Sequence, residues 1–132
     1  MIEEMIIQVK QCLPLKITEV HWDGTIFQIY GQRWNFTTLS AWRVSIDNKM
    51  LFGCFDKDSV QLTSCLNNVE ILDIAFQSDL LKIDPVFVLS NGQKIEIFST
   101  DTYEPWTFQV NELAVFTATP GEPSVFNPRL GR

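Results

Sequence analysis

The sequence is poor in histidine and cysteine, the side chains that most often bind transition metals or act as catalytic bases and nucleophiles. His21 is the only histidine, and Cys12, Cys54 and Cys65 are far apart and are each followed by an apolar residue. A secreted disulfide framework favours an even number of cysteines, and a zinc site favours close pairs. We therefore expect three reduced, buried thiols, no metal and no cofactor.

The chain also lacks long apolar runs and an excess of positive charge. No apolar run approaches the roughly 20 residues that a membrane helix requires. Residues 1–7 are acidic where a signal peptide is basic, so we expect a cytoplasmic protein without membrane contact. The net charge of −6 disfavours direct binding of nucleic acid, because phosphate groups would be repelled.

No motif of a known catalytic centre is present. The sequence contains no phosphate-binding glycine loop, dinucleotide fingerprint or nucleophile elbow. His21 and Asp23 would lie on one face of a strand, but a general base also needs a nucleophile beside it. Asp56 and Asp58 lack the glycine and the terminal glutamate of a calcium loop. We therefore predict no catalytic residue and a non-enzymatic protein.

What is present fits one globular domain. The chain has 132 residues, of which 45% are hydrophobic and 20% charged, which is enough to bury a core. We predict a single domain over residues 1–118. Residues 119–132 contain three prolines and two glycines, which predicts an extended C-terminal tail.

Two Asx-Gly pairs divide the chain into hairpins. Asn91-Gly92 joins two apolar runs within residues 86–99, and Asp23-Gly24 joins runs at 17–22 and 26–30. Such pairs favour a two-residue type I′ turn, in which both central residues have positive φ. Alternating apolar residues predict further strands near 34–36, 42–47, 50–55, 69–76, 106–110 and 113–118. The strands between residues 17 and 55 predict a five-strand meander.

The N-terminus has a different period. Ile2, Met5, Ile6 and Val9 recur at helical spacing, and Pro14 ends the segment, so we predict a helix over residues 2–12. A strand is the alternative interpretation. The fold class predicted is mostly β (α+β), with an antiparallel curved sheet or a partly open barrel and a short N-terminal helix.

Negative charge is concentrated in one segment. Residues 70–112 contain eight acidic and two basic residues, a net charge of −6 that equals that of the whole chain. Within it, residues 101–106 combine acids with aromatic rings, a combination that suits docking on a basic groove. The alternative is that Trp106 faces the core. The candidate partner-binding residues are Asp79, Asp84, Asp101, Tyr103, Glu104 and Trp106.

One pattern points to a family. An alternating strand from Val69 is followed by Ser78-Asp79-Leu80, Phe87-Val-Leu-Ser-Asn-Gly92, Ile95-Glu-Ile-Phe98 and Tyr103-Glu-Pro-Trp106. This pattern, about a third of the chain, resembles small bacterial immunity proteins of polymorphic toxin systems, including contact-dependent growth inhibition. The resemblance implies a protein that binds and blocks a cognate toxin in the producing cell.

The acidic segment adds an expectation about that partner. We expect a basic toxin domain, a nuclease, whose phosphate-binding surface would be covered. Two other classes stay open. One is a small-molecule-binding β-barrel or minor enzyme with a pocket in the barrel mouth. The other is a structural or oligomeric subunit that pairs through an exposed strand edge.

Overall fold

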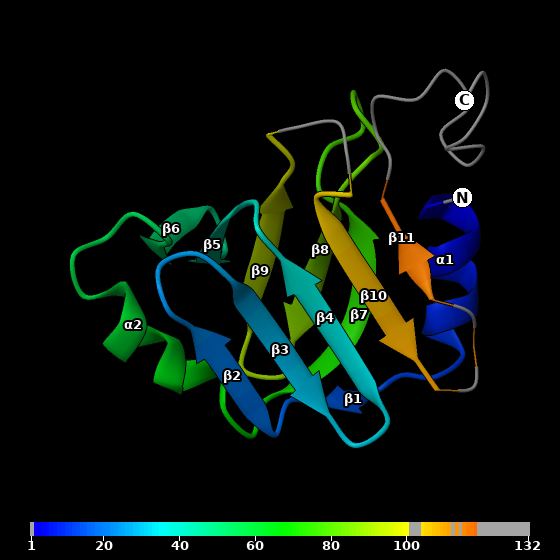
Figure 1. The fold of residues 1–132 in the computed structure, drawn as a ribbon, viewed down its shortest axis with the longest axis horizontal. Helices are drawn as coiled ribbons and strands as arrows, with labels where there is room; N and C mark the ends of the chain where they lie inside the picture. Colours follow the sequence, from blue (N-terminus) through cyan, green and yellow to red (C-terminus); the bar gives the residue numbers. More distant parts are fainter. Residues whose placement is uncertain (1, 101–103, 112, 114, 119–132) are drawn as a thin grey trace.

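The computed structural model describes residues 2–100, 104–111, 113 and 115–118, which form two antiparallel sheets and a short N-terminal helix (Figure 1). The predicted fold class, mostly β with one N-terminal helix, is confirmed, and the described strands form no closed barrel. The predicted tail, residues 119–132, lies outside the described residues.

The N-terminal helix, α1, spans Ile2–Lys10 and ends two residues before its predicted end. Its four apolar side chains at helical spacing are all buried, so the helical interpretation is correct and the strand alternative is wrong. The helix packs against β7 (Glu70–Phe76), where Lys10 Nζ lies 3.5 Å from Asp73 Oδ1. A second helix, α2 (Ser59–Leu62), and a 3₁₀ helix, η1 (Thr63–Leu66), lie between β6 (Lys49–Gly53) and β7.

The strands are divided between two sheets. The six-stranded sheet has the order β1 (Leu15–Lys16), β7, β8 (Pro85–Leu89), β9 (Gln93–Phe98), β5 (Ala41–Ile46) and β6 (Lys49–Gly53). The five-stranded sheet has the order β11 (Phe116–Thr117), β10 (Trp106–Val110), β4 (Trp34–Thr38), β3 (Phe27–Gly31) and β2 (Glu19–Trp22). The predicted five-strand meander is therefore wrong: β2–β4 lie in one sheet, and the chain crosses at Leu39-Ser40 into the other.

Aromatic side chains from the two sheets meet in the core. The ring of Phe36 on β4 lies 4.9 Å from that of Phe87 on β8, edge to face. The ring of Phe27 on β3 stacks on Trp42 of β5 at 4.3 Å. Burying one such side chain contributes about 1.5–3 kcal/mol, so these contacts across the interior hold the sheets together.

Both Asx-Gly hairpins form, but neither contains the predicted type I′ turn. Gly24 and Gly92 have φ of +96° and +85°, whereas Asp23 and Asn91 are not among the residues with positive φ. The connections between the paired strands are residues 23–26 and 90–92, which are longer than the predicted two-residue turns. A side-chain oxygen stabilises each loop. Asn91 Oδ1, for example, accepts a hydrogen bond from the backbone N–H of Gln93 at 3.0 Å.

The cysteines are free, as predicted, but their burial differs from the prediction. Cys12 and Cys54 are half-buried, and Cys65 is exposed. Partial burial still raises the pKa of the Cys65 thiol, which keeps it mainly protonated near neutral pH.

Candidate functional site

Three connections meet at one end of the two-sheet sandwich. They are the β4–β5 connection, the β7–β8 connection and the β9–β10 connection (Figure 1, upper side). We use the name loop end for the described residues of these connections together with the adjoining strand residues Thr38 and Trp106, which gives residues 38–40, 77–84, 99–100 and 104–106. It contains four of the six residues that the sequence analysis selected as partner-binding.

Asp84 is at the centre of the loop end. Its side chain is 3% exposed, and its carboxylate accepts hydrogen bonds from the backbone N–H of Ser99 (2.7 Å), the Ser99 hydroxyl and the indole Nε1 of Trp106 (3.1 Å). A buried carboxylate is costly unless it is hydrogen-bonded in this way. Because Asp84 precedes β8, Ser99 follows β9 and Trp106 begins β10, this carboxylate links two of the three connections.

The carbonyl oxygen of Pro105 links the third. It accepts hydrogen bonds from Thr38 Oγ1 (2.8 Å), Ser40 Oγ (3.4 Å) and the backbone N–H of Leu39 (3.3 Å). Thr38 and Ser40 are 1% and 5% exposed, so these bonds are shielded from water. The β4–β5 connection is thereby fixed to the beginning of β10.

The predicted site residues fall into three groups. Asp79 and Glu104 are exposed, as a partner contact requires. Asp84 and Trp106 are buried, and Trp106 packs 5.7 Å from the ring of Phe36, as the core interpretation expected. Buried side chains cannot touch a partner in this conformation, so we revise the role of these two from contact to support. The remaining predicted residues, Asp101 and Tyr103, lie outside the described residues.

The loop end exposes three leucines that were not among the predicted partner-binding residues. Leu39, on the β4–β5 connection, is 64% exposed. Leu80 is 98% exposed and Leu81 is 62% exposed, on the β7–β8 connection. The exposure of Leu80 and Leu81 was indicated in the sequence, because a Leu-Leu pair in a polar connection fits neither strand nor helix periodicity. Ser99, Thr38 and Ser40 were also missed, and nothing in their local sequence reveals that they donate to buried acceptors.

The loop end has an acidic surface. Asp79 and Glu104 are exposed, and Lys82 is the one basic residue among the described residues of the loop end. The ammonium group of Lys82 lies 5.2 Å from the centre of the Phe76 ring, which holds it against the strand. Glu104 has a φ of +48°, a left-handed conformation that is uncommon outside glycine and recurs at functional sites.

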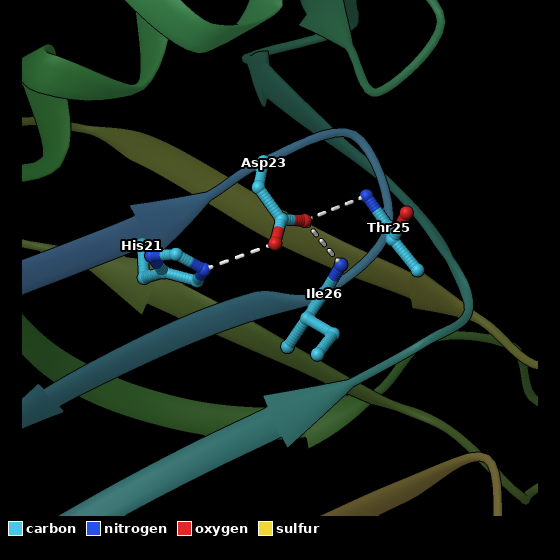
Figure 2. Close-up of polar contacts among 4 residues, drawn as sticks. All are labelled: His21, Asp23, Thr25 and Ile26. Atoms are coloured by element: carbon cyan, nitrogen blue, oxygen red, sulfur yellow. Dashed lines mark hydrogen bonds and ion pairs between the residues drawn. The ribbon is translucent and has the colours of Figure 1, made fainter.

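The His21–Asp23 pair lies at the turn between β2 and β3. His21 Nε2 lies 3.3 Å from Asp23 Oδ2, and Figure 2 shows the other carboxylate oxygen turned toward the hairpin backbone. That oxygen accepts hydrogen bonds from the N–H groups of Ile26 (2.9 Å) and Thr25 (2.8 Å), which lower the pKa of Asp23. Asp23 therefore stabilises the β2–β3 turn, and His21 is its exposed neighbour.

A second surface feature lies on the outer face of β5, β6 and β9. Two open hollows of about 260 and 270 Å³ share Arg43 and Met50. Between them Arg43 donates to Glu96 at 2.7 and 3.1 Å, and its guanidinium lies 4.7 Å from the centre of the Phe98 ring. The small-molecule alternative expected a pocket in a barrel mouth, and the described strands enclose no barrel.

Neither a metal centre nor a membrane-spanning helix is found among the described residues. Within the described ranges, no cluster of three His, Cys, Asp or Glu residues could hold a metal ion. No helix in the described part of the chain is long and apolar enough to cross a membrane. No protein-family model, curated protein or solved structure matches the chain. We therefore base the proposed function on the loop end.

Proposed function

We propose that this chain is a non-enzymatic immunity protein that neutralises a cognate toxin by covering its active or substrate-binding surface with the loop end. The observation that carries the proposal is the acidic, exposed loop end on a support of buried hydrogen bonds, with Asp84 at its centre. The toxin is expected to be a basic nuclease, and the encounter takes place in the cytoplasm of the producing cell.

Electrostatics supports this kind of partner. The segment 70–112 has a net charge of −6, and Asp79 and Glu104 present part of that charge at the loop end. A nuclease surface that binds phosphates is basic. Attraction between the opposite charges would therefore raise the association rate constant by roughly 10- to 1,000-fold. An acidic surface seated there would also exclude the nucleic-acid substrate.

Rigidity supports an interface at the loop end. Ordering a mobile loop on binding costs about 0.5–1.5 kcal/mol per immobilised side chain. The β4–β5 and β7–β8 connections are already held by bonds to Pro105 and Asp84. A partner that binds them would therefore lose less affinity to loop ordering.

The test expresses the proteins encoded by the genes that flank the gene of this chain, and it takes as the probe a product that is toxic to cells lacking the chain. We expect the chain to protect cells that express the toxin domain and to bind it at a rate that falls as salt is raised. Replacing Asp79 and Glu104 together by Lys should slow association about tenfold, because the steering charge is reversed. The matched control is the Glu19→Lys, Asp58→Lys double variant, which makes the same change of net charge at exposed acids elsewhere.

The outcomes separate the proposal from its competitors. Association that slows equally in both double variants would mean that net charge, and not the loop end, steers the partner. Absence of both binding and protection for the wild-type chain would contradict the proposed function. Circular dichroism of each variant checks that the fold is retained.

A further inference from the structure

Leu80 and Leu81 are adjacent exposed leucines on one connection. Single leucines are exposed elsewhere, among them Leu39 at 64% and Leu72 at 50%, whereas the leucines of the core are buried. Leu66 and Leu89 are 0% and 2% exposed, whereas Leu80 is 98% and Leu81 62% exposed. Single exposed apolar residues are ordinary on protein surfaces. Two in succession at the tip of a connection place a large apolar side-chain area in water.

The backbone around the two leucines is held in place. The backbone N–H of Leu80 donates to Ser78 Oγ at 3.2 Å, and that of Ile83 donates to the Leu81 carbonyl at 2.9 Å. At the base of the connection, the N–H of Gln77 donates to the carbonyl of Asp84 at 2.8 Å. The leucines therefore project from a connection closed at its base and hydrogen-bonded within.

We infer that Leu80 and Leu81 form the apolar anchor of the loop end, entering an apolar pocket rimmed by basic residues on the toxin. This inference rests on the proposed function and deepens it. The acids Asp79 and Glu104 set the rate of association, and the two leucines set the lifetime of the complex. Apolar anchors in desolvated pockets typically dominate binding energy, while rim charges act mainly on the association rate.

Charge complementarity selects this occupant. A second copy of the chain would bring its own Asp79 and Glu104 against the same two acids, and Lys82 is the one base among the described residues of the loop end that could oppose them. An anionic lipid surface would be repelled by the net charge of −6. A basic protein surface with an apolar pocket satisfies both the exposed leucines and the acids beside them.

The experiment measures the rate constants of association and dissociation with the neighbouring toxin domain by surface plasmon resonance. We expect the Leu80→Ala, Leu81→Ala double variant to dissociate about 30-fold faster, with association changed less than twofold. Leu80→Met keeps apolar volume and should dissociate within threefold of wild type. The control is Val60→Ala, which shortens a side chain of 52% exposure on α2, away from the loop end in Figure 1.

Each outcome decides the inference. Unchanged dissociation of the folded double variant would overturn the anchor while leaving the proposed function in place. Absence of a wild-type complex would remove both. Self-association in sedimentation, or binding to phosphatidylglycerol vesicles, that is lost in the double variant would assign the leucines to a different occupant and overturn the inference.

Discussion

Among the described residues, the hydrogen-bond donors to the Asp84 carboxylate belong to Ser99 and Trp106. An asparagine at this position keeps the shape but turns an NH₂ group toward one of those donors. We predict that Asp84→Asn lowers the free energy of unfolding by about 1–3 kcal/mol, because a buried donor is left without an acceptor. Urea denaturation at pH 7 measures it.

Asp79→Asn is the matched control for this substitution. Asp79 lies on the same connection and is exposed, so its free energy of unfolding should stay within about 0.5 kcal/mol of wild type. Equal stability of the Asp84 and Asp79 variants would show that the buried carboxylate does not hold the loop end together.

Glu96 makes the stability of the folded state depend on pH. Partial burial alone would raise the pKa of its carboxyl group, but hydrogen bonds from Arg43 and Ser45 outweigh that and lower the pKa below its ordinary 4.5. A lowered pKa in the folded state means that the stabilisation is present above pH 4.5 and is lost as the pH falls through the folded pKa.

The prediction is that Glu96→Gln is less stable than wild type at pH 6 and that the difference shrinks toward pH 3. Thermal denaturation across that range measures it. Glu19→Gln, at an exposed position on β2, serves as control and should track the wild type. A difference between Glu96→Gln and wild type that is constant with pH would contradict the assignment.

At the scale of elements, Gly31 at the end of β3 shows how closely two strands approach. A Cβ atom at this position would lie 2.0 Å from the carbonyl oxygen of Lys16 and 2.5 Å from Trp34 Nε1. The same indole nitrogen donates to that carbonyl at 3.1 Å. Gly31→Ala should therefore displace the backbone of β1 and break this bond.

We expect Gly31→Ala to destabilise the protein by about 1–3 kcal/mol, the usual cost of overpacking an interior. Urea denaturation followed by circular dichroism measures it. Gln32→Ala, the exposed neighbour, is the control. Wild-type stability of Gly31→Ala would mean that β1 can move away without loss.

The local sequence pattern was enough to predict most helices and strands. It was not enough to predict which distant strands pair with one another. Alternation identified β7 to β10, and glycine at positions 24 and 92 identified the hairpins. Alternation tells which residues share a face, but it does not tell which sheet a strand joins. Hence the pairing of β4 with β10 and the crossing at Leu39-Ser40 were missed, and so was the burial of Asp84.

The edge strand β6 bears on the alternative of a structural subunit. Its register shifts against β5, so that Val44 pairs with Phe52 and Ser45 with Met50, leaving Leu51 as an extra residue. Such a bulge twists an edge strand and discourages pairing with another chain. The edge that β6 presents is therefore a poor template for assembly.

At the scale of the whole molecule, hydrogen bonds within the loop end link the two sheets to each other. Asp84 precedes β8 of the six-stranded sheet, and Trp106 begins β10 of the five-stranded sheet. Their hydrogen bond therefore spans the sandwich at this end. Changes that loosen the packing of one sheet on the other should also disturb the surface that we propose as the interface.

Because its indole donates to Asp84, Trp106 is a buried spectroscopic probe of binding at the loop end. The chain has four tryptophans, and the indoles of Trp22, Trp34 and Trp106 donate to three different acceptors. Among the described residues, the indole of Trp42 has no acceptor. Fluorinated tryptophan would therefore give four signals in distinct surroundings. The chemical shift of the Trp106 signal would change when a partner binds the loop end, although no label is placed on the surface itself.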